Sequence, residues 1–221
     1  MNRLAIFDCD GTLVDSGASI HRALTDCFER SGIAAPSRDT GRRVIGLSLH
    51  EAMAALLPEH GSDDHAALVE EYKRSFIALR SAGAVEEPLY EGIAEVLDAL
   101  EDDGWQLAVA TGKSDRGLRH CLEKHGIAGR FVSLQTADRH PSKPDPSMAL
   151  QAIAEAGAAP ETSVVIGDTS FDMLMAAKAG ARAIGVDWGY HDRDELVAAG
   201  AAAVAVHPAE LLDHLRGANH D

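Results

Sequence analysis

Short apolar runs recur along the chain and alternate with segments of helical periodicity. The runs occupy residues 3–7, 106–110, 131–134, 163–166, 181–186 and 203–206. Strands that are buried on both faces of a parallel sheet read as near-continuous apolar runs of this kind. Between them, Ile93, Val96 and Leu97 show the spacing of a helix face. This βαβα order predicts an α/β fold with a doubly wound, mainly parallel, Rossmann-like sheet.

One interval, residues 15–84, breaks the alternation. It contains no strand-like run, but it has two apolar stripes at helical spacing, one through Ile20 and Leu24 and one through Leu68 and Tyr72. A segment of this length is too long for a simple connection between strands. We therefore expect an inserted all-helical domain at 15–84, with the α/β core formed by 1–14 and 85–221.

Composition excludes several classes of partner. The chain has 221 residues and a net charge of −15, which disfavours binding to nucleic acid or to an anionic membrane. No apolar run is long enough for a membrane span, and the first residues show no signal-peptide pattern.

The cysteines, Cys9, Cys27 and Cys121, form no paired motif. We expect a cytoplasmic protein; the sequence carries no signal for oligomeric state.

Polar residues that could bind ligands or take part in catalysis follow four of the predicted strands. Carboxyl ends of parallel strands share one edge of the sheet, where open α/β folds place their sites. The candidates at this edge are Asp8, Asp10, Thr111, Gly112, Lys143, Asp168 and Asp172. Asp8 and Asp10 are two positions apart and should face the same way.

The balance of charge among these residues predicts a metal. If the motifs converge, four carboxylates face one lysine, Lys143, and such a cluster needs a cation. Oxygen-only ligands favour a hard divalent ion, most often Mg²⁺. Beside Mg²⁺ and a lysine, one carboxylate stays ionised and can act as a nucleophile, while a second can transfer protons.

The ordered motifs resemble those of the haloacid dehalogenase-like hydrolase superfamily. They read Asp8-x-Asp10-Gly11-Thr12-Leu13-Val14-Asp15-Ser16, Thr111-Gly112, Lys143-Pro144-Asp145-Pro146 and Gly167-Asp168-x3-Asp172. The resemblance covers essentially the whole chain and is strongest to the phosphoglycolate phosphatase branch. It implies a Mg²⁺-dependent phosphatase that acts on a small phosphorylated metabolite.

The resemblance also implies a role for each motif residue. Asp8 would attack phosphorus, and Asp10 would protonate the leaving alkoxide and then activate water. Mg²⁺ would be held by the carboxylates of Asp8 and Asp168 and the backbone carbonyl of Asp10, with Asp172 supporting it mainly through waters. Thr111, Gly112 and Lys143 would bind the phosphoryl group.

The helical insert would then be a cap that closes over the site and selects the substrate. Arg43, Gly46 and His21 are candidates for contacts with substrate, although solvated arginines at a helix end are an equally good interpretation of that segment. Lys113 is expected at the surface or at the rim of the site. Phosphoglycolate is the favoured substrate on resemblance alone.

Two other functions remain open. The first is a sugar phosphomutase similar to β-phosphoglucomutase, which shares the motifs and the cap. The second is a protein that binds phosphorylated metabolites without catalysis. Dehalogenation is disfavoured because Asp10 and the full set of metal-binding residues are present, and phosphonate cleavage is disfavoured because Lys73 is the only lysine of the insert.

Overall fold

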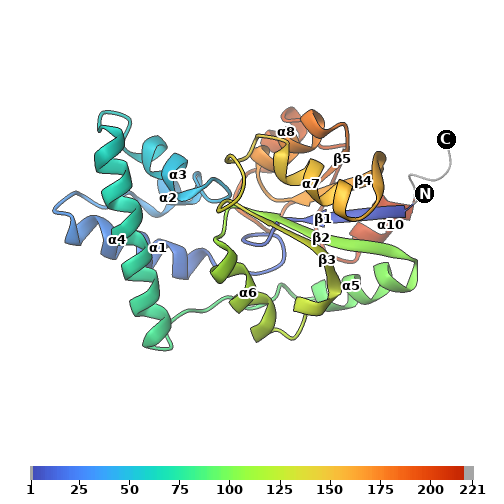
Figure 1. Cartoon of the computed structure of the whole chain (residues 1–221), viewed down its shortest axis with the longest axis horizontal. Helices are drawn as coiled ribbons and strands as arrows, with labels where there is room; N and C mark the ends of the chain where they lie inside the picture. The colour runs from blue at the N-terminus through green and yellow to red at the C-terminus, as the bar shows by residue number, and fades with distance from the viewer. Residues whose placement is uncertain (1, 217–221) are drawn as a thin grey trace.

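A six-stranded sheet lies at the centre of the α/β part of the protein, in strand order β3-β2-β1-β4-β5-β6 (Figure 1). The computed structural model describes residues 2–216, and within them every neighbouring pair of these strands is parallel. The strands are β1 (Asn2–Phe7), β2 (Trp105–Thr111), β3 (Phe131–Thr136), β4 (Ala158–Gly167), β5 (Arg182–Val186) and β6 (Ala203–Ala205). This confirms the doubly wound parallel sheet predicted from the apolar runs.

Helices cover both faces of this sheet. Along β1, Ala5 and Phe7 belong to one apolar cluster, and Leu4 and Ile6 belong to a second cluster on the opposite face. The first cluster includes residues of α5 (Ile93–Asp102), α6 (Asp115–Lys124) and α10 (Glu210–Arg216). The second includes residues of α7 (Ser147–Glu155), α8 (Ser170–Ala179) and α9 (Arg193–Ala198). A short 3-10 helix, η1 (Ala128–Arg130), precedes β3. Burial on both faces explains why these strands are so continuously apolar.

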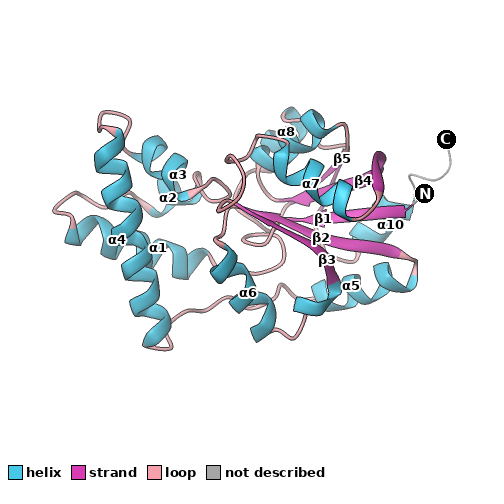
Figure 2. Cartoon of the chain, viewed as in Figure 1, coloured by secondary structure: helices cyan, strands magenta, loops and turns pink. Residues whose placement is uncertain are grey.

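A group of helices lies beyond the carboxyl ends of the strands (Figures 1 and 2). It comprises α1 (Gly17–Arg30), α2 (Arg38–Arg42), α3 (Leu49–Leu56) and α4 (Ser62–Ser81), all between β1 and β2. We call this group the helical insert. It has its own apolar cluster, in which Phe28 of α1 and Leu68 of α4 are buried, separate from the two clusters of the sheet. We keep residues 15–84 as its proposed bounds.

The chain enters and leaves the helical insert through two segments that lie side by side. The amide of Asp15 donates to the carbonyl of Pro88 at 2.9 Å, and the amide of Tyr90 donates to the carbonyl of Leu13 at 3.0 Å. Val14 forms an isolated antiparallel bridge with Leu89 between these bonds. The insert is therefore attached to the sheet at one narrow, hydrogen-bonded place.

Side-chain contacts also hold the helical insert against the α/β core. The amide of Ser48 donates to Ser142 Oγ at 2.8 Å, and Arg42 Nη2 donates to the carbonyl of Gly189 at 2.9 Å. Ser48 also begins α3, because its Oγ accepts a bond from the amide of Glu51. These contacts place the turn between α2 and α3 directly over the loops that follow the strands.

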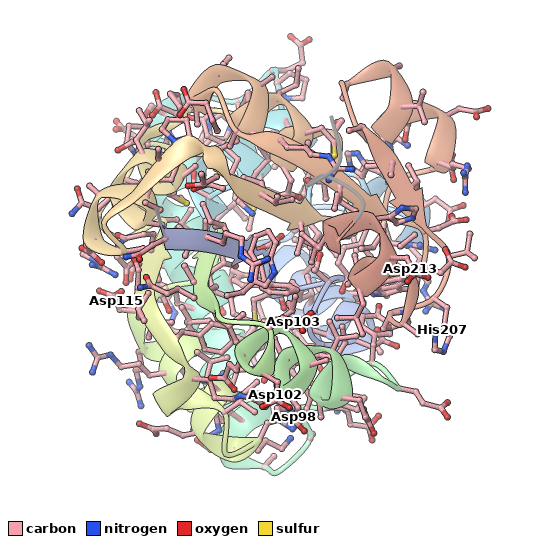
Figure 3. The ribbon with its side chains drawn as sticks, turned by 90° about the vertical axis from the view of Figure 1, so that its right-hand side faces the viewer. Asp98, Asp102, Asp103, Asp115, His207 and Asp213 are labelled. Atoms are coloured by element: carbon pink, nitrogen blue, oxygen red, sulfur yellow. The ribbon has the colours of Figure 1, made fainter. Side chains whose placement is uncertain are left out.

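Part of the acidic excess lies at the end of the molecule away from the helical insert (Figure 3). Asp98 and Asp102 lie on α5, and Asp213 lies on α10. Asp98 pairs with Arg130 at 2.6 Å and is otherwise largely exposed. The net charge of −15 therefore does not come only from the acids at the carboxyl ends of the strands. Across the part of the chain that the structure describes, every helix is too short or too polar to cross a membrane.

Candidate active site

The loops that follow β1 and β4 bring the predicted carboxylates together at the centre of the sheet edge. β1 and β4 are neighbours, and the strand order reverses between them, which is where open α/β sheets form a crevice. Asp8 follows β1 directly, and Asp168 follows β4 directly. Both side chains are buried, with exposed fractions of 1% and 0%.

Asp8, Asp168 and Asp172 form a compact oxygen site. One carboxylate oxygen from each of the three lies within 4.8 Å of the others. Thr12 Oγ1 donates to Asp168 Oδ1 at 2.8 Å, and the amide of Tyr190 donates to Asp168 Oδ2 at 2.9 Å. These bonds fix the direction in which the Asp168 carboxylate points.

Asp172 owes its position to the start of α8. Its Oδ2 accepts bonds from the amide and the Oγ1 of Thr169, at 3.1 and 2.7 Å, which is a capping-box arrangement. Its Oδ1 lies 2.6 Å from Lys143 Nζ. The same residue therefore stabilises the helix N-terminus and orients the lysine.

Lys143 is fully buried between two carboxylates, with Nζ at 3.0 Å from Asp8 Oδ1 and 2.6 Å from Asp172 Oδ1. Burial alone would lower the pKa of Lys143, but Asp172 and Asp8 outweigh it and raise that pKa, so the lysine is charged. One lysine cannot balance three buried carboxylates. The second oxygen of Asp8, Oδ2, is also buried with no hydrogen-bond partner among the described residues.

The residues present fit a hard divalent cation. Burial raises the pKa of Asp8 to about 7, even though Lys143 acts in the opposite direction. Burial, together with the neighbouring charges of Asp8 and Asp172, also raises the pKa of Asp168. A cation among these oxygens would reverse both shifts, since it favours the ionised carboxylates. An all-oxygen donor set with an unpartnered oxygen is suited to Mg²⁺.

Asp10 lies apart from the three clustered carboxylates and has different partners. Its Oδ1 accepts a bond from Ser16 Oγ and lies 2.7 Å from Lys113 Nζ. Lys113 Nζ also lies 2.8 Å from Glu87 Oε1, and Glu87 is 1% exposed. The Asp10 carboxylate is therefore held by hydrogen bonds outside the metal-type cluster, and the proposed contact of Asp10 with a metal is left to its backbone carbonyl.

Lys113 lines the cavity beside the site, but the expectation that it could lie at the surface is wrong. Its side chain is only 9% exposed and lies between Asp10 and Glu87, not at the surface. Burial alone would lower the pKa of Lys113, but Asp10, Cys9 and Glu87 together raise it. Nothing in the residue order shows that Lys113 turns inward, because Glu87 comes from the segment that returns from the helical insert.

Glycines around the acids provide space that a side chain would fill. A Cβ on Gly189 would lie 2.1 Å from Asp168 Cβ, and a Cβ on Gly11 would lie 2.2 Å from Asp168 Oδ2. Gly11 also has φ of +85°, a conformation that other residues rarely adopt. The tight packing of backbone around Asp168 keeps that carboxylate in one position.

A cavity of about 560 Å³ lies between these loops and the helical insert. Asp8, Asp10, Thr111 and Gly112 contribute to it from the sheet edge. Thr111 is buried at the end of β2, and Ser114 begins α6, with its Oγ accepting from the amide of Gly117. The cavity gives a substrate access to the acids from the side of the insert.

The three residues predicted on the helical insert lie in different surroundings. Gly46 lines the cavity. Arg43 forms an ion pair with Glu195 of α9, and its guanidinium is half exposed. The residues that line the cavity do not include Arg43 or His21.

Other polar residues of the site were not assigned a role from the sequence. Ser16 bonds to Asp10, and its Oγ lies 3.2 Å from the buried Tyr190 hydroxyl. Ser16 belongs to the motif that begins at Asp8, so the sequence could have indicated that it lies at the site. Tyr190 and Glu87 come from distant loops, and nothing in the sequence indicates their positions.

Comparison with known proteins agrees with this geometry. Residues 5–186 match the family described as haloacid dehalogenase-like hydrolase. The chain is 37% identical over 205 residues to the probable phosphatase IndB of Dickeya dadantii, covering 90% of this chain and 87% of that protein. It is 34% identical over 197 residues to a phosphoglycolate phosphatase of Agrobacterium fabrum, covering 87% and 83%. A haloacid dehalogenase-like hydrolase structure from Streptococcus pneumoniae superposes with a TM-score of 0.84 at 27% identity, covering 96% and 98%.

Proposed function

The chain belongs to the haloacid dehalogenase-like hydrolase family, and from this membership we propose that it is a Mg²⁺-dependent phosphatase for a small phosphomonoester. The observation that carries the proposal is the buried group of Asp8, Asp168 and Asp172 with Lys143 at 3.0 Å from Asp8. Phosphoglycolate is the first compound to test, because the Agrobacterium relative has that name.

In the first step, an oxygen of Asp8 attacks phosphorus. The new bond joins that oxygen to phosphorus, the phosphate ester bond breaks, and the leaving alkoxide takes a proton from Asp10. Lys143 and Thr111 bind the oxygens of the transferring phosphoryl group. When bound at Asp8 and Asp168, Mg²⁺ supplies electrostatic stabilisation of the charge that develops on that group.

In the second step, Asp10 takes a proton from a water molecule, whose oxygen attacks phosphorus and displaces Asp8. Phosphate leaves and the Asp8 carboxylate is regenerated. Ser16 and Lys113 hold Asp10 in place for both proton transfers. Two roles for two aspartates follow from their different surroundings, since only Asp8 lies in the clustered group.

The test is phosphate release from a panel of phosphomonoesters, with Mg²⁺ and then with a chelator. We expect release that depends on the metal, and we expect Asp8→Asn to lower turnover by at least about a thousandfold because it removes the nucleophile. The matched control is Asp102→Asn, the same change on the exposed end of α5.

Asp8→Asn should remain folded, because it removes one of several crowded buried negative charges. Circular dichroism checks this point. Turnover that survives in Asp8→Asn would overturn the assignment of the nucleophile. Isomerised sugar phosphate without free phosphate would instead support a phosphomutase, and binding of the panel without any turnover would support a non-catalytic role.

A further inference from the structure

The cavity above the catalytic acids has a wall that the proposed chemistry does not use. Its floor is formed by Asp8, Asp10, Thr111 and Gly112. One side is lined by other core residues, Lys113, Ser114, Arg116, Gly117, Ala137 and Asp138, and the remaining lining residues belong to the helical insert. The apolar and aromatic residues of that wall are Ile20, Leu24, Val44, Ile45, Leu47, Leu49, Ala52, Met53, Leu56, Val69, Tyr72, Phe76 and Ile77. They come from α1, the turn before α3, α3 itself and α4, so the wall is a property of the whole insert.

We propose that the substrate is the phosphate ester of an apolar alcohol, aliphatic or aromatic, whose organic group fills the part of the cavity inside the helical insert. This inference rests on the proposed phosphatase activity and concerns the leaving group only. The inference predicts that the phosphate ester of an apolar alcohol is a better substrate than phosphoglycolate.

The size of the cavity supports the proposal. A volume of about 560 Å³ is in the range of pockets that bind drug-sized molecules. A two-carbon acid on the phosphate would leave much of this space to water in contact with apolar side chains, whereas a larger apolar group would displace that water.

The charges around the floor also disfavour a short acidic leaving group. The carboxylate of phosphoglycolate would lie one methylene beyond the ester oxygen, and a nearby unpaired cation would favour its binding. Lys113 lines this part of the cavity, but its ammonium group is already paired with both Asp10 and Glu87. Lys73 and Arg116 also line the cavity, but their exposed side chains place them towards its solvent-facing side.

Arg80 also lines the cavity, and its Nε is buried with no hydrogen-bond partner among the described residues, but Arg80 is not one of the floor residues. Its guanidinium lies over the ring of Phe76, with 5.2 Å between the guanidinium carbon and the ring centroid. It also lines a neighbouring hollow formed by α4 and α6, away from the floor residues. The cationic groups of the insert therefore border the apolar wall and do not replace it.

The test uses n-alkyl phosphates from ethyl to octyl. These esters have the same charge, and their alcohol leaving groups have nearly the same reactivity. Each buried methylene favours transfer from water by about 0.8 kcal/mol, so kcat/KM should rise about fourfold per methylene until the cavity is full. We expect hexyl phosphate to exceed both ethyl phosphate and phosphoglycolate by at least about 50-fold. A flat series, or a preference for phosphoglycolate, would overturn the inference.

A substitution in the apolar wall separates the role of the wall in substrate binding from general damage to the fold. Val69→Phe places a larger side chain into the cavity from α4 and should shorten the longest alkyl chain that is still accepted. The control is Val197→Phe on α9, where the native side chain is 54% exposed. Loss of stability alone would lower the rate for every chain length and leave the preferred alkyl chain length unchanged. That result would contradict the proposal that the apolar wall binds the alkyl chain.

Binding of alkylphosphonates, measured by calorimetry, makes the two proposals distinguishable. These compounds keep the anionic head and the alkyl chain but have no ester bond to hydrolyse. If no ester releases phosphate while phosphonate affinity still rises with chain length, the proposed function fails and the apolar cavity stands. If esters are hydrolysed without any dependence on chain length, the function stands and the inference about the leaving group fails.

Discussion

At the scale of single residues, the candidate site is a place where burial opposes charge. Asp8 is almost completely buried, and this burial raises its pKa to about 7 against the influence of Lys143. Close to neutral pH, the metal-free protein therefore holds a proton that a bound cation would displace. Metal binding and proton release are coupled at this carboxylate.

We predict that Mg²⁺ binding releases protons below pH 7 and tightens as the pH rises towards 7. The carboxyl group of Asp8 is protonated in metal-free protein below its raised pKa, so the cation must displace that proton; above pH 7 the group is already ionised and its contribution ends. The proton on Asp8 alone should change the affinity by up to about tenfold per pH unit below 7, and Asp168, whose pKa is also raised, adds to that change. Calorimetry in buffers of different ionisation heat, at pH 6 and pH 8, measures the released protons.

Asp8→Asn provides the control for that measurement, because an asparagine has no proton to release. The proton release attributed to Asp8 should be absent in this variant at pH 6. Equal proton release in the variant and the native protein would show that another group is responsible.

The sequence identified the acids because strand ends impose a simple rule on them. Asp8, Asp168 and Lys143 each follow an apolar run, so their convergence could be predicted without any knowledge of side-chain packing. Lys113 obeys no such rule. Its direction depends on Glu87, which reaches it only because the segment returning from the insert passes beside the site.

At the scale of elements, the helical insert and the sheet have separate apolar interiors. Leu68 of α4 packs with residues of α1 and α3 in the insert, and none of the residues in that cluster belongs to a strand. Helices were predictable there from their apolar stripes. β4 was predicted too short, because its first half contains Pro160, Glu161 and Thr162 and carries no apolar signal.

We predict that Leu68→Ala destabilises the helical insert by about 2–5 kcal/mol, because it leaves a cavity in a small apolar cluster. Hydrogen exchange should show faster exchange of amides in α1 and α4, with little change in β1 and β2. The control is Leu150→Ala on α7, where the leucine is 45% exposed. Equal loss of protection in the sheet would show that insert and sheet unfold as one cooperative unit.

At the scale of the whole molecule, β1 lies in the middle of the sheet but comes first among the six strands in the order of the chain. Phe7 of β1 pairs with Val109 of β2 and Ile166 of β4, so both partners come much later in the chain. The contacts within the helical insert join residues of one continuous segment. Closing a longer loop costs more conformational entropy, which slows the formation of distant contacts.

We predict that α1 and α4 become protected before β1 when the unfolded chain refolds. Pulse-labelling of amides during refolding, followed by mass spectrometry, measures this order. Protection of β1 in the same kinetic phase as α1 would contradict the prediction, since it would mean that the distant strand pairs form as fast as the local helix contacts.

The bridge between Val14 and Leu89 has a consequence for how such proteins diversify. Because the outgoing and returning segments lie side by side, everything between them can be exchanged as a cassette without rerouting the strands. Under the proposed function, mutations in the cassette would reshape what the enzyme recognises, while the acids proposed to break the ester bond stay on the strand ends outside it. Recognition and chemistry can therefore be inherited, grafted or redesigned as separate modules.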